Sequence, residues 1–409
     1  MKILQLTNKV PYPPSDGGVI AVLSLAVGFA DLGHDVTVLS MSTLKHNFDV
    51  KDIPKEFSSQ ISFISVNVPA KISPIGLLQN YLFSSKPYTA TRFISVDYSL
   101  KLIKLLSDNR YDIIQLEGLY LAPYIDLIKR HSNAPIVMRA HNVEHEIWER
   151  VKENTSNKLK KIYLKNLNRK LRKFELSFLD SYDLLLPITQ RDGFKFKDLG
   201  FENEIYTLPT GIDADRYTYD SKQTNYPSLF HLGSLDWEPN LEGLRWFLTE
   251  IWPEILKKEP TIKFYVAGRN ASTEVIKYLQ SFENVIFDGE VEDANLYINS
   301  KAIMIVPLLS GSGMRIKILE GLALAKAIVS TEIGVEGISA KDGEEIMIAT
   351  QNNEFVNKVV DLLQNPSLYK KISENARAYI VREFDNKIIV KGLIEKYQKL
   401  LAKSNPKSK

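Results

Sequence analysis

The stretch best suited to chemistry is residues 311–320 (GSGMRIKILE), in which two glycines are followed by two cations and a carboxylate. It comes after an apolar run that ends at Pro307, and its spacing then becomes helical. Backbone amides at the start of a helix attract phosphate oxygens, and small residues let a ligand approach them. The stretch therefore predicts a helix start that binds a nucleoside diphosphate.

Each polar side chain of this stretch has an expected role. Ser312, Gly313 and Met314 would present amides to the phosphates. Arg315 and Lys317 would neutralise charge, and Glu320 would accept hydrogen bonds from ribose hydroxyls. An alternative is that Lys317 and Glu320, three residues apart, form an ordinary surface ion pair. That alternative explains the pair but not the preceding glycines.

A second glycine-bearing stretch, residues 15–18 (SDGG), lies between the first expected strand and the first expected helix. Gly17 and Gly18 would let the backbone approach a ligand there. The spacing lacks the G-x-G-x-x-G pattern, so a plain tight turn is the alternative interpretation.

Residues 141–145 (HNVEH) admit two interpretations. The spelling H-x-x-E-H is found in zinc hydrolases and would make His141, Glu144 and His145 a metal site on one helix. Residues 135–140, however, are typical of a strand that runs into His141, which would separate the two imidazoles. Residues 213–215 (DAD) resemble a metal-binding aspartate pair, but we expect a structural turn there.

The elements that must position these residues follow from length and periodicity. A chain of 409 residues with 44% hydrophobic and 25% charged residues fits two α/β domains. Short apolar runs alternate with helical periods twice, which is typical of parallel sheets. The first series has expected strands at 2–8, 35–40, 111–116, 135–139 and 182–187, and a helix at 19–32 ended by Gly33. The second has expected strands at 228–233, 262–267, 285–287, 302–307 and 327–330, and a helix at 241–256.

These series predict two Rossmann-like domains, an N-terminal one over 1–205 and a C-terminal one over 206–384. A final helix at about 385–403 is expected to pack back on the first domain. Ligands of such sheets bind at the carboxyl ends of the strands, so we expect the substrates in a cleft between the domains.

Composition excludes several classes of function. The formal charge of +3 is too balanced for a dedicated nucleic-acid binder. The absence of cysteine excludes disulfides and cysteine-ligated zinc. The chain starts directly with a strand pattern and has no apolar run of about 20 residues, so a cytoplasmic location is expected.

One segment is locally very basic: residues 158–173 contain eight Lys or Arg and no acidic residue. Its apolar residues recur at helical intervals: Leu159, Ile162, Tyr163, Leu167, Leu171 and Phe174. The segment 158–174 is therefore a candidate for peripheral contact with an anionic membrane at the inner face of the cell. The alternative is a solvated helix whose apolar stripe packs on its own domain.

Taken together, the motifs resemble the large group 1 (GT4-like) family of retaining glycosyltransferases with the GT-B fold. The stretches that carry the resemblance, besides 311–320, are residues 15–18 (SDGG), 139–144 (RAHNVE), 209–213 (PTGID), 233–240 (GSLDWEPN) and 328–337 (IVSTEIGVEG). Each is weak alone, but their order is specific, and they span nearly the whole chain.

The resemblance implies transfer of a sugar from a nucleotide-diphosphate sugar to a glycan or lipid-linked acceptor, with retention at the anomeric carbon. It suggests a role in capsule or lipopolysaccharide synthesis. No cofactor or metal is expected. The resemblance also implies that the domain over 1–205 binds the acceptor and that the domain over 206–384 binds the donor. His141 would contact the sugar near its reacting centre, and Ser234 would belong to the donor site. A GT-B sugar epimerase and a non-catalytic nucleotide-sugar-binding subunit are the alternatives.

This sequence departs from the family pattern in two places. The family commonly has two glutamates seven residues apart; Glu320 matches the second, but Ser312 stands at the first. The arginine and lysine that members often place near 233–240 are also missing. Charge compensation is therefore assigned to Arg315 and Lys317, with Arg269 as a further contributor.

Overall fold

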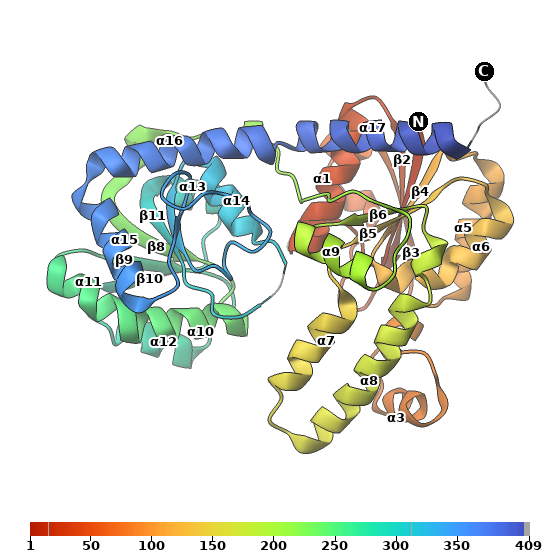
Figure 1. Ribbon diagram of the computed structural model, residues 1–409, viewed down its shortest axis with the longest axis horizontal. Helices are drawn as coiled ribbons and strands as arrows, with labels where there is room; N and C mark the ends of the chain where they lie inside the picture. Colours follow the sequence, from red (N-terminus) through yellow and green to blue (C-terminus); the bar gives the residue numbers. More distant parts are fainter. Residues whose placement is uncertain (15, 312, 405–409) are drawn as a thin grey trace. The chain divides into compact units, whose positions relative to one another are not determined.

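The computed structural model describes residues 1–14, 16–311 and 313–404. The chain forms two compact units (Figure 1). Unit 1 comprises Met1–Gly211 together with the C-terminal segment that begins at Ile389. Unit 2 comprises Ile212–Ile388. The chain therefore passes between the units twice.

Unit 1 is built on a parallel sheet with strand order β3-β2-β1-β4-β5-β6-β7. The strands are β1 Lys2–Thr7, β2 Asp35–Ser42, β3 Ile61–Asn67, β4 Ile113–Glu117, β5 Ile136–Ala140, β6 Leu184–Pro187 and β7 Glu204–Ile205. The five strands expected from the sequence are confirmed. The additional strands β3 and β7 lie at the two edges of the sheet.

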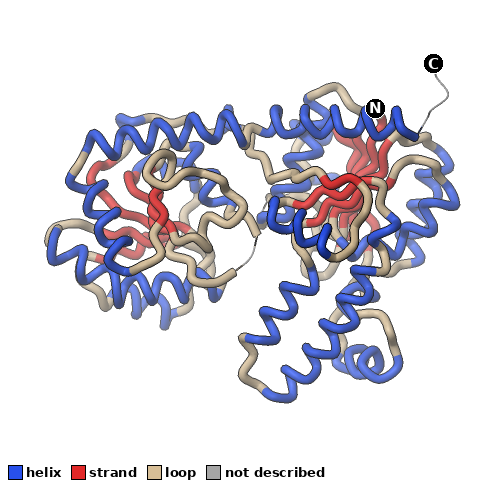
Figure 2. Tube along the Cα trace, viewed as in Figure 1, coloured by secondary structure: helices blue, strands red, loops and turns tan. Residues whose placement is uncertain are grey.

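Unit 2 has a second parallel sheet with strand order β10-β9-β8-β11-β12-β13. Its strands are β8 Asn225–Leu232, β9 Phe264–Ala267, β10 Val285–Gly289, β11 Lys301–Val306, β12 Ala327–Ser330 and β13 Met347–Ile348. All five expected strands are present. The central strand β11 is apolar and almost wholly buried because helices cover both faces of the sheet (Figure 2).

Helices connect the strands of both sheets. In unit 1 they are α1 Gly17–Asp31, α2 Lys55–Ser58, α3 Pro74–Phe83, α4 Tyr88–Thr91, α5 Val96–Asp108, α6 Ile125–His131, α7 Glu144–Glu153, α8 Lys158–Leu176 and α9 Gln190–Asp198. In unit 2 they are α10 Glu238–Trp246, α11 Trp252–Lys258, α12 Thr273–Gln280, α13 Ala294–Ser300, α14 Ile316–Ala323, α15 Asn352–Gln364 and α16 Pro366–Glu383, with a π-helical turn at Phe247–Ile251. Among the described residues, no helix is long and apolar enough to cross a bilayer.

The last helix, α17 Asn386–Ser404, starts in unit 2 and covers the sheet of unit 1. Val390, Leu393 and Tyr397 are fully buried there, in one apolar cluster with Ile3 of β1 and Phe29 of α1. The sheet of unit 1 therefore depends on a helix that comes from the far end of the chain.

Each sheet has a point where successive connections leave in opposite directions. In unit 1 this point lies between β1 and β4, and in unit 2 it lies between β8 and β11. The loops that leave two such strands diverge and form a crevice at their carboxyl ends, where α/β sheets bind ligands. Of the site residues expected from the sequence, Ser234, Gly313, Met314 and Arg315 lie in the loops after β8 and β11, whereas His141 follows β5 and Arg269 follows β9.

Candidate functional site

The glycine-bearing stretch of unit 2 forms a loop before a helix rather than the first turn of one. Gly311 and Gly313 have φ values of +119° and +82°, which a right-handed helix does not contain. Arg315 is the extended N-cap residue, and α14 begins at Ile316. Gly313 and Met314 thus lie in the loop between β11 and α14. Ser312 lies outside the described residues.

Lys317 connects this loop with the start of α10, the helix that follows β8. Its Nζ donates to Asn240 Oδ1 at 2.9 Å, and Asn240 Nδ2 donates to the carbonyl oxygen of Ser234 at 2.9 Å. Asn240 is buried in the first turn of α10, directly after the loop that follows β8. The structure therefore brings Lys317 and Ser234 together at the switch point of the sheet. Asn240 belongs to the stretch 233–240, but its role was not foreseen.

The electrostatics of α14 differ from those of a surface helix. Burial, with a smaller contribution from the charge of Arg315, lowers the pKa of Lys317 to about 7. Burial raises the pKa of Glu320 to about 7, although a hydrogen bond from Tyr217 opposes this shift. The hydroxyl of Tyr217 donates to Glu320 Oε1 at 3.3 Å. Because Lys317 and Glu320 have separate partners, the surface ion pair considered as an alternative is not what the structure shows.

Arg315 is nearly buried and lies against the glycine loop. Its Nη1 donates to the carbonyl oxygen of Gly313 at 2.6 Å, and its guanidinium carbon lies 5.6 Å from the ring centre of Trp237. A Cβ at Gly311 would approach Arg315 Nη2 to 2.7 Å. The glycine therefore leaves the space that the guanidinium occupies.

The loop after β8 packs against the loop after β9. A Cβ at Gly268 would come within 1.7 Å of the carbonyl oxygen of Gly233, so this contact requires glycine at position 268. The amide of Leu235 donates to the carbonyl oxygen of the neighbouring Arg269 at 2.8 Å, and the side chain of Arg269 is exposed. Ser234 Oγ donates to Asp236 Oδ1 at 2.5 Å. Arg269 and Ser234 thus lie on adjoining loops.

His231 lies near the end of β8, and the sequence analysis did not single it out. It is fully buried, and its Nδ1 donates to the carbonyl oxygen of Ile305 at 2.9 Å. Burial and the charge of Lys317 lower the pKa of His231 well below its ordinary value. The imidazole is therefore neutral and adds no charge beside Lys317.

In unit 1, His141 follows β5 directly and lies beside a buried carboxylate. Its Nε2 is 3.0 Å from Glu117 Oε2, at the end of the neighbouring strand β4. Glu117 Oε1 accepts from Gln5 Nε2 at 3.1 Å, and Arg139 Nη1 lies 3.8 Å from Oε2. Burial alone would raise the pKa of Glu117, but Arg139 and His141 hold that pKa below its ordinary value. Since a carboxylate only accepts hydrogen bonds, Nε2 of His141 carries the hydrogen.

Glu117 is a site residue that the sequence analysis missed. It directly follows the expected strand 111–116, and a carboxylate at a strand end was the available signal. Its contact with His141 depends on the pairing of β4 with β5, which is a tertiary feature.

Gly17 and Gly18 lie at the same edge of this sheet. Gly17 is the first residue of α1, and the Asp16 side chain caps the helix by accepting from the Val19 amide at 3.0 Å. Lys9 Nζ pairs with Asp16 at 2.7 Å. A capped helix start with glycines suits both a structural turn and close approach of a ligand, so the role of the two glycines stays a prediction.

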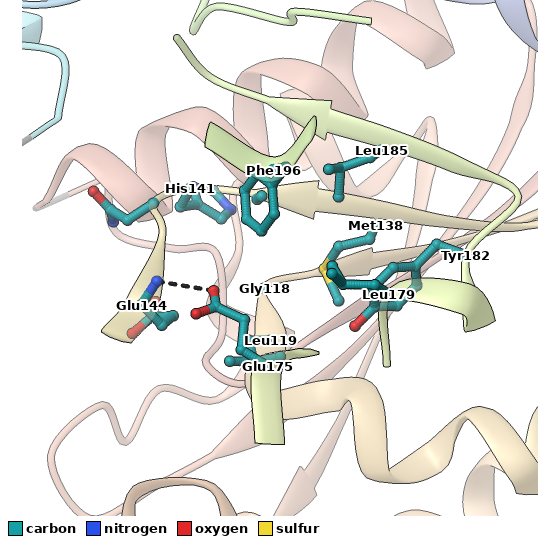
Figure 3. Close-up of a pocket in the computed structure, with 12 residues that line it drawn as sticks. Gly118, Leu119, Met138, His141, Glu144, Glu175, Leu179, Tyr182, Leu185 and Phe196 are labelled. Carbon is teal, nitrogen blue, oxygen red and sulfur yellow. Dashed lines mark hydrogen bonds between the residues drawn. The ribbon is translucent and has the colours of Figure 1, made fainter. Parts of the chain in front are cut away.

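A pocket opens beside His141 (Figure 3). Met138, Leu185 and Phe196 are among its apolar wall residues, and Glu144 and Glu175 are its carboxylates. Glu175 Oε1 accepts from the amide of Glu144 at 2.9 Å. Burial raises the pKa of Glu144 to about 7, and the charge of Glu175 adds to this shift.

The zinc interpretation of residues 141–145 does not fit this geometry. His141 precedes α7, whereas His145 lies in the helix and pairs through Nδ1 with Glu175 at 2.5 Å. The two imidazoles thus bind different glutamates. Asp213 pairs with Arg216 and Asp215 with Lys387, so these aspartates are also held by separate cations. Within the described ranges, no group of three or more histidine or acidic side chains is arranged to hold a metal ion.

Comparison with known proteins agrees with this arrangement. Residues 226–365 match the family model for glycosyl transferases group 1, and residues 15–216 match that for glycosyltransferase family 4. A Klebsiella pneumoniae protein described as an uncharacterized 44.6 kDa protein in the cps region is 25% identical over 407 residues, which cover 96% of this chain and 99% of that protein.

Solved structures share the fold at low identity. Sucrose-phosphate synthase from Thermosynechococcus elongatus superposes with a TM-score of 0.71 at 14% identity, over 98% of this chain and all of that chain. Anabaena HepE in complex with UDP superposes with a TM-score of 0.68 at 13% identity, over 98% of this chain and all of the HepE chain. The two family models together span most of the chain and both of its units. The chain therefore belongs to the group 1 glycosyltransferases and has the GT-B fold.

Proposed function

We propose that this glycosyltransferase transfers a sugar, with retention, from a nucleoside diphosphate sugar to a glycan or lipid-linked acceptor. The observation that carries the proposal is the partly buried cation Lys317, which Asn240 holds at the switch point of the unit 2 sheet. Among the described residues no carboxylate pairs with this ammonium, and burial lowers its pKa to about 7. A diphosphate would supply an anionic partner.

In the proposed reaction, the bond between the anomeric carbon and the diphosphate oxygen breaks, and a bond to the acceptor hydroxyl oxygen forms on the same face. The acceptor proton passes to the departing diphosphate. The negative charge that develops on the diphosphate is stabilised by Lys317, Arg315 and the amides of the loop before α14. Arg269 and Ser234 contribute donors from the adjoining loops, and Glu320 binds the ribose hydroxyls.

His141 is proposed to position the transferred sugar. With its Nε2 hydrogen donated to Glu117, the other ring nitrogen of a neutral imidazole accepts a hydrogen bond from a sugar hydroxyl. Glu117 is then a positioning residue that fixes the orientation and tautomer of the ring.

The proposal includes no metal and no cofactor. Two cations next to the phosphates, Arg315 and Lys317, provide the charge that a metal supplies in other glycosyltransferases. The nucleoside diphosphate sugar is a substrate.

The relatives suggest which compounds to test first. Structures of HepE include complexes with UDP and with UDP-glucose, so uridine diphosphate sugars are the first candidates for the donor. The Klebsiella relative is described as a protein of the cps region, which favours a role in the synthesis of a capsular polysaccharide.

A lipid-linked acceptor would place the enzyme at the inner face of the cell membrane, with α8 as the contact. In α8, the apolar stripe divides into two parts. Leu164, Leu167, Leu171 and Phe174 are buried in unit 1, whereas Leu159 and Ile162 are exposed. The alternative, in which the apolar stripe packs on its own domain, therefore describes the second half of α8. The exposed apolar residues of the first half could contact a membrane.

The donor site can be tested with the full-length protein and a panel of uridine, guanosine and adenosine diphosphate sugars. A ligand present at 100 times its Kd stabilises the native state by about 2.7 kcal/mol, which raises the melting temperature. We expect one nucleotide series to produce this shift and Lys317→Met to abolish it. Lys277→Met, which removes an exposed lysine from α12 of the same unit, is the matched control and should keep the shift.

Turnover is tested by incubating the responding donor with candidate glycan and lipid-linked acceptors and determining the anomeric configuration of the product by NMR. An inverted product would contradict retention. Conversion of the donor sugar without any acceptor would indicate an epimerase, and binding without product would indicate a non-catalytic subunit. A full thermal shift in Lys317→Met would contradict the proposed donor site itself.

A further inference from the structure

Helix α3 of unit 1 is apolar on the face that it turns to solvent. Ile75, Leu78, Leu82 and Phe83 are all more than half exposed, and Phe83 reaches 85%. They recur at intervals of three, four and one residues, which places them on one side of the helix. Among the residues of α3, none is buried. A helix at the surface of a soluble domain normally has the opposite arrangement.

The inner side of α3 is held by polar contacts rather than by a core. The hydroxyl of Tyr88 accepts from the Ser73 amide at 3.1 Å just before the helix, and a Cβ at Gly76 would approach this hydroxyl to 3.0 Å. Lys170 of α8 donates to the carbonyl oxygens of Asn80 and Tyr81 at 2.7 and 3.2 Å. These contacts fix the orientation of α3, so its apolar face is directed outward by the fold.

The same contacts place α3 beside the basic helix α8. The rings of Tyr81 and Tyr163 lie 6.1 Å apart. Figure 1 shows α7 and α8 projecting from the sheet of unit 1, with α3 next to α8. The first half of α8 adds the exposed apolar residues Leu159 and Ile162. We call Ile75, Leu78, Leu82, Phe83, Leu159 and Ile162 the apolar patch.

The two segments that carry the apolar patch contain basic residues and no acidic ones. Lys158, Lys160, Lys161 and Lys165 of α8 are exposed. Residues 57–96 and 154–174 contain no aspartate or glutamate, whereas Lys71 and Lys86 flank α3. An apolar face surrounded by lysines is complementary to a bilayer with anionic headgroups.

We infer that α3 inserts its apolar face into the interface of an anionic membrane while the lysines of α8 contact the headgroups. The inference rests on the proposed function in one respect: it explains how unit 1 would meet a lipid-linked acceptor. It goes further by assigning membrane insertion to α3 rather than to the basic helix alone. It is tested without any sugar transfer, so the two can fail separately.

The absence of cysteine makes a direct test available. The Leu82→Cys protein is labelled with an environment-sensitive fluorophore and mixed with vesicles of equal parts phosphatidylglycerol and phosphatidylcholine. We expect a blue shift and stronger emission, because residue 82 enters the apolar interface. Leu296→Cys, at an exposed leucine of α13 in unit 2, is the matched control and should not respond. Vesicles of phosphatidylcholine alone should give little response at either position.

Cosedimentation separates insertion from simple charge attraction. We expect Leu78→Glu/Leu82→Glu to reduce partition to the anionic vesicles by at least about tenfold, because two leucines leave the interface and two acids enter it. Leu296→Glu should bind like the unchanged protein. All variants should keep the cooperative melting transition of the unchanged protein in the absence of any ligand, which shows that they are folded.

Two results would overturn the inference. One is a pair of outcomes: Leu78→Glu/Leu82→Glu binds the vesicles undiminished, and Lys160→Glu/Lys161→Glu/Lys165→Glu does not bind them. Those outcomes would show that α8 alone contacts the membrane. The other is an unresponsive label at residue 82 in protein that has bound to the vesicles, which would show that α3 stays in water.

Discussion

Two side chains of α14 have pKa values displaced toward neutrality from opposite directions. Lys317 is lowered to about 7 and Glu320 is raised to about 7, both chiefly by burial. In each case the protein disfavours the charged form. A bound diphosphate would favour the cationic form of Lys317 and raise its pKa, so donor binding is expected to be linked to uptake of a proton.

Donor affinity should consequently decrease as pH rises above 7. At a pH below the pKa of Lys317 in the free protein, the side chain is already a cation. At a higher pH the side chain is neutral, so the protein must take up a proton when the donor binds. If one proton is taken up for each donor bound, the affinity decreases by up to about tenfold per pH unit. Isothermal titration with a nucleotide sugar, whose bridging diphosphate does not titrate near neutrality, measures this slope.

Lys317→Arg is the informative comparison, because a guanidinium stays charged throughout this range. Its affinity at neutral pH need not equal that of Lys317, but its dependence on pH should be flatter. Glu320 titrates in both proteins, so the difference between the two slopes isolates residue 317. Equal slopes would show that Lys317 does not meet the diphosphate.

The residue types of the proposed donor site could be foreseen from the sequence, but the partners of these residues could not. Arg315, Lys317 and Glu320 lie within six positions of each other, and a local pattern exposes them. Asn240 lies 77 residues before Lys317 in the sequence. It reaches Lys317 only because β8 and β11 are neighbours in the sheet. The contact of Glu117 with His141 depends in the same way on the pairing of β4 and β5.

At the scale of elements, the central strands were foreseen because burial on both faces makes them continuous apolar runs. β3 was not, since it is an edge strand in which Ile64 and Val66 remain partly exposed and polar residues alternate with them. The start of α14 was expected too early, because the positive φ values of Gly311 and Gly313 cannot be read from the residue types alone. The position of α3 depends on contacts with Tyr88 and Lys170, which local periodicity does not contain.

The position of α10 is set by one close contact. A Cβ at Gly243 would lie 2.2 Å from the carbonyl oxygen of Pro307, at the end of β11. Gly243→Ala should move α10 away from the crevice and displace Asn240 from Lys317. We expect a loss of about 1–3 kcal/mol in the free energy of unfolding and weaker nucleotide binding, measured by denaturant unfolding and by thermal shift.

Gly392→Ala on α17 is the control for this substitution. The Cβ there would meet the hydroxyl end of the Tyr206 side chain at 2.7 Å, and that ring can move aside. Its nucleotide binding should be unchanged. A Gly243→Ala protein that binds nucleotide normally would show that the contact with Pro307 does not position Asn240.

At the scale of the whole molecule, unit 1 is completed by the last segment of the chain. Tyr397 of α17 is fully buried beneath the sheet, and its hydroxyl donates to Gln115 Oε1 of β4. Gln115 and Glu117 in turn share a hydrogen bond, so α17 supports the strand that orients His141.

Tyr397→Ala should destabilise unit 1 by about 3–5 kcal/mol, the range found when large aromatic side chains are removed from a core. Tyr397→Phe keeps the ring and leaves one buried acceptor without its donor, so it should cost only about 1–3 kcal/mol. Calorimetry with and without nucleotide separates the units, because the nucleotide should raise only the transition of unit 2. Equal losses for the two variants would show that the ring does not contribute to the core of unit 1.

The two passages of the chain between the units have a consequence for proteolysis. One passage lies at Gly211 to Ile212 and the other within α17, at Ile388 to Ile389. A single cut at the first passage separates fragment 1–211 from fragment 212–409, but the second fragment carries the part of α17 that packs in the core of unit 1. A protease nick near residue 211 should therefore produce two bands on a denaturing gel that still elute as one particle under native conditions.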